Sequence, residues 1–234
     1  INIPPSTQSI FSQSEYTPHD PIHIVGNDDF TPENGVVGGS GTEEDPYIIE
    51  GWEINLSSNS SSKYGIIIED TTASFIIRNC CIHGGIESNS TTGIRLYYVV
   101  NGEIINCMIH DTYDGISLSN AGRTDIVNTT CYKNLRSGIF SSSSSDVSIH
   151  NCSIHSTFFG ILLTKSSQME IYNCSIFNNS GCSIYLFLSN NNRIQDNNLH
   201  ENDVGILVYI SPENKLCSNK IWGCLLYTSP SPRD

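Results

Sequence analysis

Apolar residues alternate with other residues over short stretches that recur seven times along the chain. A Gly-Ile pair opens most of them, and the openings fall at Gly65, Gly93, Gly115, Gly138, Gly160, Ser183 and Gly205. The first interval is 28 residues, and the following intervals are 22, 23, 22, 23 and 22 residues. Period-two alternation predicts strands with one buried face. A fixed period of this length indicates a solenoid in which each repeat packs on the next.

The second half of each repeat breaks the alternation. In Ile77-Arg78-Asn79-Cys80-Cys81-Ile82 the flanking isoleucines are five positions apart, so the chain must bend between them. Asn tolerates the left-handed conformation, and we place the bend there. The equivalent positions are Asn79, Asn106, Asn128, Asn151, Asn173, Asp196 and Ser218. Stacked amides in this column are expected to hydrogen-bond to the coils above and below.

These features predict an all-β chain that forms one single-stranded, right-handed parallel β-helix. It would have about seven rungs of 22–23 residues, with three short strands in each coil, and the handedness follows the rule for parallel crossovers. We assign residues 1–20 to a flexible leader rich in polar residues and Pro, residues 21–64 to an N-terminal cap and first coil, and residues 65–223 to the repeats. Residues 224–234 depart from the pattern and resemble a translated sequencing-library adapter, so we interpret them as non-native and the chain as a fragment.

The repeat resembles the right-handed β-helix repeat of carbohydrate-binding proteins and sugar hydrolases, and that of periplasmic copper-maturation proteins of the NosD type. The segment from Gly38-Gly-Ser-Gly to Trp52-Glu-Ile54 is similar to the start of secreted or surface-anchored microbial members. The resemblance extends from Pro21 to Gly223. It implies the fold, whereas the functions found on this fold are many.

The charge of the chain limits its partners. The formal net charge is -13 at pH 7, which argues against nucleic acid and anionic membranes. Ten acidic residues and no Lys or Arg precede Lys63. This segment is either a solvated acidic cap or a Ca²⁺ site, the latter requiring converging oxygen atoms. No apolar run is long enough to span a membrane, and we expect an extracellular, cell-surface or periplasmic location.

Two further columns follow the bend. The first contains Cys80, Cys107, Cys152 and Cys174, whose exchange with Thr129 and Asn197 indicates a tight interior position more than disulfides or a metal site. The second is expected to face outward and comprises His83, His110, Tyr132, His155, Phe177, His200 and Trp222. His83, His110 and Asp111 could bind copper or zinc, which the copper-maturation resemblance would also imply. A ladder of stacked rings is the alternative explanation.

The outward positions of the first strand suggest a binding surface. They include Arg95 and a ridge of rings formed by Tyr97, Phe140, Tyr185, Phe187 and Tyr209, with Ser and Thr between them. Such rings can stack on pyranose faces, although exposed strands favour aromatic residues in any case. Arg95 is expected to pair with Glu69, and Asp111 and Asp114 are interpreted as turn residues.

No carboxylate pair suited to glycoside hydrolysis lies among these positions. We therefore favour a non-catalytic, exported or cell-surface module without a cofactor that contacts polysaccharides or other surface polymers. One alternative is a polysaccharide hydrolase or lyase truncated before its site is complete. The other is a NosD-like periplasmic protein that handles copper.

Overall fold

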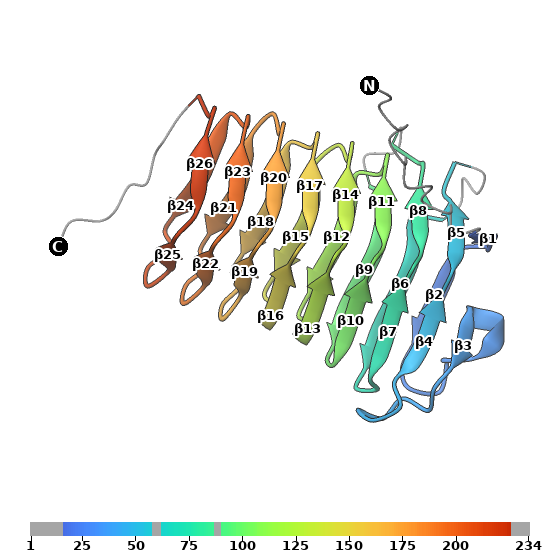
Figure 1. Cartoon of the computed structure of the whole chain (residues 1–234). Coiled ribbons are helices and arrows are strands. Elements are labelled where there is room, and N and C mark those ends of the chain that lie inside the picture. Colours follow the sequence, from blue (N-terminus) through green and yellow to red (C-terminus); the bar gives the residue numbers. More distant parts are fainter. Residues whose placement is uncertain (1–15, 58–61, 87–89, 226–234) are drawn as a thin grey trace, which may run out of the picture.

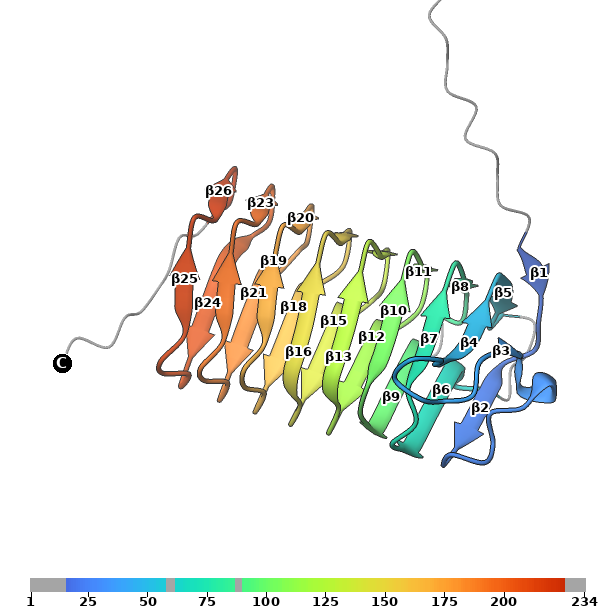
Figure 2. The same cartoon turned by 60° about the horizontal axis from the view of Figure 1, so that its bottom comes forward.

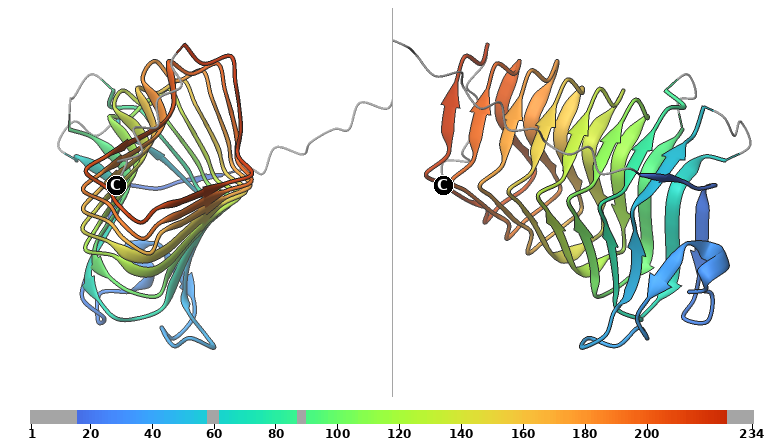
Figure 3. Two further views of the ribbon diagram at one scale, coloured as in Figure 1. Left: turned by 90° about the vertical axis from the view of Figure 1, so that its left-hand side faces the viewer. Right: turned by 45° about the vertical axis from the view of Figure 1, so that its right-hand side comes forward.

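The chain forms a stack of similar coils along one axis. The computed structural model describes residues 16–57, 62–86 and 90–225. Successive coils lie side by side from the N-terminal end to the C-terminal end (Figures 1 and 2). Viewed along the axis, the coils overlie one another around a three-sided outline (Figure 3). The parallel β-helix predicted from the repeat is confirmed.

Each coil contributes one strand to each of three sheets, which we call the ridge sheet, the groove sheet and the ring sheet. The ridge sheet contains, in spatial order, β2 (Ile22–Val25), β6 (Tyr64–Thr71), β9 (Thr92–Val99), β12 (Asp114–Ser119), β15 (Ser137–Ser142), β18 (Phe159–Thr164), β21 (Cys182–Phe187) and β24 (Val204–Tyr209). The groove sheet contains β3 (Val36–Gly38), β4 (Tyr47–Glu50), β7 (Phe75–Arg78), β10 (Gly102–Ile105), β13 (Gly122–Val127), β16 (Ser145–His150), β19 (Glu170–Tyr172), β22 (Arg193–Gln195) and β25 (Lys215–Cys217). The ring sheet contains β1 (Thr17–Pro18), β5 (Trp52–Asn55), β8 (Cys81–His83), β11 (Met108–His110), β14 (Thr130–Tyr132), β17 (Ser153–His155), β20 (Ser175–Phe177), β23 (Asn198–His200) and β26 (Lys220–Trp222).

The N-terminal end departs from this regularity. A short 3-10 helix, η1 (Pro32–Asn34), precedes β3, and β3 pairs antiparallel with β4. Strand β1 pairs with β5, so residues 17–18 belong to the fold and that part of the predicted flexible leader is wrong. Residues 1–15 lie outside the described residues, as do residues 226–234 of the predicted adapter segment. No helix in the described part of the chain is long and apolar enough to cross a membrane.

Columns of isoleucine fill the interior. Ile94, Ile116 and Ile139 lie opposite one another on β9, β12 and β15, and all three are fully buried. Equivalent columns on the groove sheet and the ring sheet complete one continuous core. Because like residues sit over like, one β-branched side chain can fill each position of the stack without a change in shape.

The glycine that opens six of the seven repeats lies in close packing. A Cβ atom at Gly93 would lie 2.3 Å from Cγ2 of Ile109 and 2.7 Å from the carbonyl oxygen of Gly115. Gly138 and Gly160 face similar neighbours from the ring sheet. The repeated Gly thus marks a corner where two sheets approach closely, and a larger side chain would overpack the core there.

The predicted bends are present, but their amides do not form the expected ladder. The seven bend residues have φ values between 49° and 56°, in the left-handed region. Asn106, Asn128, Asn151 and Asn173 are exposed, and no hydrogen bond joins one member of the column to another among the described residues. The side chains project from the corner into solvent, because the left-handed turn directs the following residue, and not the bend residue, into the core.

Asn ladders occur instead at buried positions. Asn179 donates from Nδ2 to Oδ1 of Asn202 over 2.8 Å, and Asn197 donates in the same way to Asn219 over 2.9 Å. Thr112 occupies the equivalent place beside Asn134 and donates its hydroxyl over 2.8 Å. These side chains also bond to backbone groups at the corners, so the ladders satisfy polar atoms that water cannot reach.

The cysteine column is buried, as predicted. Cys80, Cys107, Cys152 and Cys174 carry free thiols and are at most 2% exposed. Each thiol donates to the carbonyl oxygen of an Ile in the preceding coil, as Cys152 does to Ile126 over 3.5 Å. Thr129 and Asn197 occupy the same column and hydrogen-bond to the backbone of the adjacent coil. Small side chains that hydrogen-bond to the backbone therefore interchange here.

Candidate functional site

The outward face of the ridge sheet forms two parallel columns of side chains. The strand register places Arg95, Ser117, Phe140, Leu162, Tyr185 and Leu207 in one column, from β9 to β24. The second column, two residues further along each strand, contains Tyr97, Ser119, Ser142, Thr164, Phe187 and Tyr209. The ridge predicted from the sequence is thus a single surface, with hydroxyl groups between rings and no carboxylate on these twelve positions.

Arg95 lies between aromatic rings at one end of this face. Its guanidinium carbon is 5.5 Å from the ring centroid of Tyr64 and 5.2 Å from that of Tyr97. The predicted ion pair with Glu69 is absent, because Glu69 accepts a hydrogen bond of 2.8 Å from the imidazole of His23. The register explains the error: Arg95 stands opposite Ile67, whereas Tyr97 stands opposite Glu69.

A second guanidinium supports the centre of the face. Arg136 donates from Nε to Oδ1 of Asp114 over 2.9 Å and from Nη2 to Oδ2 over 2.5 Å. Its guanidinium also lies over the rings of Phe140, at 4.3 Å, and Tyr113, at 5.1 Å. Asp114 is 4% exposed and accepts a further hydrogen bond from the Ser137 hydroxyl, so it is an anchor and more than the turn residue expected from the sequence.

The far end of the ridge is aromatic. The rings of Phe187 and Tyr209 stack with centroids 5.8 Å apart, and the Tyr185 ring lies 6.4 Å from that of Phe187. Desolvation, with smaller contributions from Cys182 and Tyr209, raises the pKa of Tyr185. Desolvation likewise raises the pKa of Tyr97. Both phenols therefore remain neutral near pH 7 and can donate hydrogen bonds.

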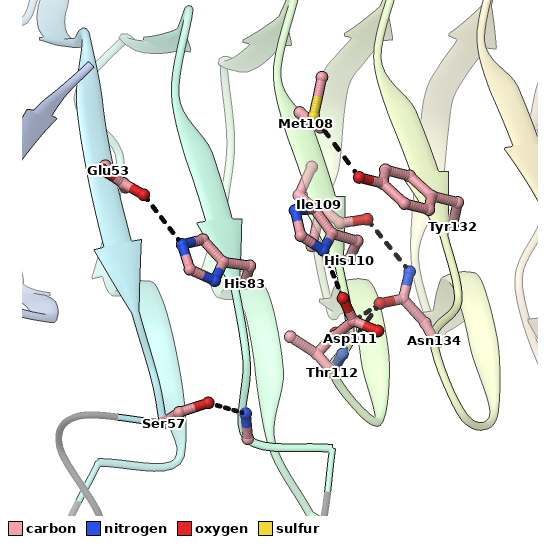
Figure 4. Close-up of polar contacts among 11 residues, drawn as sticks. Glu53, Ser57, His83, Met108, Ile109, His110, Asp111, Thr112, Tyr132 and Asn134 are labelled. Carbon is pink, nitrogen blue, oxygen red and sulfur yellow. Dashed lines mark hydrogen bonds and ion pairs between the residues drawn. The ribbon is translucent and has the colours of Figure 1, made fainter. Parts of the chain in front are cut away.

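The second predicted site consists of stacked rings. His83 and His110 stack with centroids 5.2 Å apart, and the stack continues through Tyr132 at 4.6 Å (Figure 4). It then passes through His155, Phe177 and His200 to Trp222. The ring ladder considered as the alternative to a metal site is thus present in the structure. Burial, with a smaller contribution from Lys133, lowers the pKa of His155, so this ring is neutral near pH 7.

One ring nitrogen of His83 and one of His110 have partners within the protein. Nε2 of His83 lies 3.1 Å from Oε1 of Glu53, and Nδ1 of His110 lies 2.7 Å from Oδ2 of Asp111 (Figure 4). Face-to-face rings direct their nitrogen lone pairs along parallel planes and not toward one point. In the described part of the chain, no group of three or more His, Cys, Asp or Glu side chains could hold a metal ion.

Sequence reasoning missed a set of charged residues on the groove sheet. Glu103 stands opposite Asp125, Asp125 opposite Ser148, Ser148 opposite Glu170, and Glu170 opposite Arg193. Desolvation, reinforced by the charge of Asp125, raises the pKa of Glu103. The signal was present in the sequence, because each residue directly precedes the repeated Ile of its coil and so lies one position from the core.

This charged column lies along shallow depressions. One, of about 460 Å³, is lined by Asp125, Ser148, Glu170 and Arg193 among others. A smaller one, of about 200 Å³, is lined by Glu43, Glu103, Arg123 and Asp125. Asp125 borders both depressions, so they lie next to each other along the groove sheet.

Several solved structures share this architecture. The A-module of the Azotobacter vinelandii mannuronan C-5 epimerase AlgE4 matches with a TM-score of 0.63 and 18% identity, over 80% of this chain and 63% of that chain. The periplasmic alginate epimerase AlgG matches with a TM-score of 0.58 and 15% identity, over 74% of this chain and 50% of that chain. Pectate lyase Pel9A matches with a TM-score of 0.58 and 11% identity, over 88% and 69%. At these identities the likeness establishes the fold, and the chain spans less than two thirds of the length of both epimerases.

Sequence comparison gives the family. No match was found among curated proteins. The model of the right-handed β-helix region matches residues 49–190 and 113–229, which together cover most of the chain and include every strand from β5 to β26. The handedness expected from the crossover rule is therefore that of the family. The chain belongs to the right-handed parallel β-helix family.

Proposed function

We propose that this β-helix binds a polysaccharide along the outward face of the ridge sheet. The observation that carries the proposal is the face itself: aromatic rings and hydroxyl groups at strand spacing, with no carboxylate among the twelve outward positions from β9 to β24. Aromatic rings pack on the apolar faces of pyranose rings, while Ser, Thr and Tyr hydroxyls hydrogen-bond to sugar hydroxyls. The names of the structural neighbours, which include alginate epimerases and a pectate lyase, support a polymer of sugars as the partner.

The face is preorganised for this role. Phe140 is held by Arg136, and Arg136 is held in turn by the buried carboxylate of Asp114. Strands paired on both sides fix the backbone beneath the rings, so little conformational entropy is lost when a ligand binds. A repeating surface of this kind suits a repeating ligand, because successive sugar units can meet equivalent coils.

Binding can be tested by isothermal titration with a panel of soluble polysaccharides, both neutral and acidic. We expect Tyr185→Ala together with Phe187→Ala to abolish measurable binding while leaving the circular dichroism spectrum unchanged. The matched control is Tyr172→Ala on the groove sheet, which removes a half-buried stacked ring of similar size. Unchanged affinity in the double variant would contradict the proposal.

A second candidate function, cleavage of a polysaccharide, is supported by Glu103 and Asp125. Neighbouring strands lie about 4.8 Å apart, which brings two carboxyl groups in register near the separation of about 5–5.5 Å used by retaining glycosidases. The raised pKa of Glu103 is the property that a general acid needs. Release of reducing ends that is lost in Glu103→Gln would support this function. Binding without any product would leave the ridge sheet as the functional face.

A further inference from the structure

The charge of the ridge sheet differs from that of the whole chain. The protein carries 24 acidic and 11 basic residues. On the outward positions from β9 to β24, however, the single charged residue is Arg95. Two carboxylates of this sheet are engaged in ion pairs, Glu69 with His23 and Asp114 with Arg136, and a third, Asp70 at the end of β6, is exposed and acts on Tyr97. The twelve outward positions thus carry one positive and no negative charge on an acidic protein.

Within the described part of the chain, Arg95 differs from Arg78 and Arg136 in forming no ion pair with a carboxylate, although Arg123 and Arg193 on the groove sheet also form none. Arg78 pairs with Glu50 at 2.6 Å and Arg136 pairs with Asp114 at 2.5 Å. No carboxylate among the described residues forms an ion pair with Arg95, whose guanidinium meets two tyrosine rings instead. The rings of Tyr64 and Tyr97 restrict the guanidinium group and stabilise its charge, but they leave hydrogen-bonding valences unsatisfied.

The environment of Arg95 suits an anionic group on a ligand. A guanidinium presents parallel N–H groups that match the two oxygens of a carboxylate or the oxygens of a sulfate. Phe140 and Leu162 continue the same column beyond the small Ser117 side chain. A sugar unit could thus place its anionic substituent against Arg95 while neighbouring units of the polymer contact the apolar part of the column.

The acidic residues elsewhere do not prevent this contact. The Debye length is about 8 Å at physiological ionic strength, so exposed charges farther than this from a ligand on the ridge sheet are largely screened. A polymer that approached the groove sheet would meet Asp125 and Glu170, which repel anions. Of these two faces, only the ridge sheet has no carboxylate among its twelve outward positions, and we expect an acidic polymer to prefer it.

We infer that the ligand of the ridge sheet is an acidic polysaccharide whose carboxylate or sulfate groups bind to Arg95. This inference rests on the proposed function and narrows it to one substrate class. It also assigns Arg95 a role distinct from that of the rings: the rings supply affinity for sugar in general, and Arg95 supplies the preference for charge.

The test uses polymers that differ in charge alone. Polygalacturonate is compared with its methyl ester for carboxylate recognition, and dextran sulfate with dextran for sulfate recognition, by isothermal titration of the whole chain. We expect at least one charged polymer to bind about tenfold more tightly than its neutral counterpart. Arg95→Gln should remove this preference, because a charged hydrogen bond contributes enough free energy for about that factor. Arg95→Lys should retain part of it.

The control variant is Arg123→Gln, which removes an exposed positive charge at the edge of the groove sheet and should leave the preference intact. Equal affinity for charged and neutral polymers, or a preference that survives Arg95→Gln, would overturn the inference and leave the proposed function standing. Failure of all four polymers to bind would overturn the proposed function and the inference together. The polymer pair that shows the preference identifies the anionic group.

Discussion

The ridge sheet and the groove sheet are built from the same coils yet present opposite surfaces. Inside the solenoid, both sheets contribute columns of buried Ile, and their strands pair in the same parallel register. Outside, the ridge sheet carries rings, hydroxyls and Arg95, whereas the groove sheet carries Glu103, Asp125, Glu170 and Arg193. The interior of a β-helix is constrained by stacking, and the exterior is free to differ from sheet to sheet.

The two faces also manage charge differently. On the ridge sheet the buried Asp114 is neutralised by two hydrogen bonds from Arg136. On the groove sheet desolvation raises the pKa of Glu103, and the like charge of Asp125 opposite it adds to the rise. The Asp114–Arg136 pair stabilises the ridge surface. The Glu103–Asp125 pair is repulsive, and the fold tolerates it because the depression is open to solvent.

The largest expected effect is a difference in the free energy of unfolding between a variant of the ridge sheet and a variant of the groove sheet. Arg136→Ala leaves the buried carboxylate of Asp114 without its cation, and loss of such a partner costs about 3 kcal/mol. Arg193→Ala on the groove sheet removes an exposed guanidinium that bonds to Gln195, and should cost less than about 0.5 kcal/mol. Urea unfolding measures both changes. Equal losses would show that Asp114 and Arg136 do not support the ridge sheet as proposed.

A smaller effect is expected on the polysaccharide affinity of the ridge sheet. Tyr185→Ala alone should weaken polysaccharide binding by about fivefold, because one aromatic contact contributes on the order of 1 kcal/mol. Ser119→Glu should also weaken binding of an acidic polymer, since it introduces a carboxylate into the column of Tyr97, beside that of Arg95. Titration of both variants against the polymer that the native chain binds provides the measurement. A Ser119→Glu chain with native affinity would contradict the importance of the charge of this face.

The smallest effect concerns the pH dependence of the groove sheet. The pKa of Glu103 is raised on folding, so its protonated form stabilises the fold below the pKa of the unfolded chain. That stability is lost as the pH rises through the folded pKa. Glu103→Gln should therefore stabilise the protein at pH 7 by a few tenths of a kcal/mol, as expected for relief of a like-charge cross-strand pair.

The gain from Glu103→Gln should disappear in acid, where Glu103 is protonated in both states. Thermal unfolding at pH 7 and at about pH 3.5, which is below the ordinary pKa of Glu, follows the difference. Ser148→Ala, which removes the hydroxyl that donates to Asp125, is the matched change in the same column and should give no gain at either pH. A gain from Glu103→Gln that is independent of pH would show that packing and not ionisation is responsible.

Much of the candidate site followed from counting positions in the repeat. Phe140 and Tyr185 were correctly placed in one column because strands alternate and coils have equal length. The same counting would have found Glu103 opposite Asp125, had it been applied to the position before the repeated Ile. Arg95 was assigned the wrong partner, because the register sets it opposite Ile67 and sets Glu69 opposite Tyr97, and Glu69 bonds to His23 of the preceding strand of the sheet.

The sequence by itself determined the solenoid, its strand faces, the left-handed corners and the burial of Cys107 and its equivalents, because equal repeats stack like residues over like. The tertiary structure decided which polar groups bond to one another. Asn106 points into solvent while Asn179 joins a buried ladder, although both are Asn at corners of the coil. Asp114 likewise became a buried anchor only when Arg136 of the next coil reached it. Local pattern fixes which face of a strand is buried, whereas the pairing of side chains depends on directions in space that are set only when the coils are stacked.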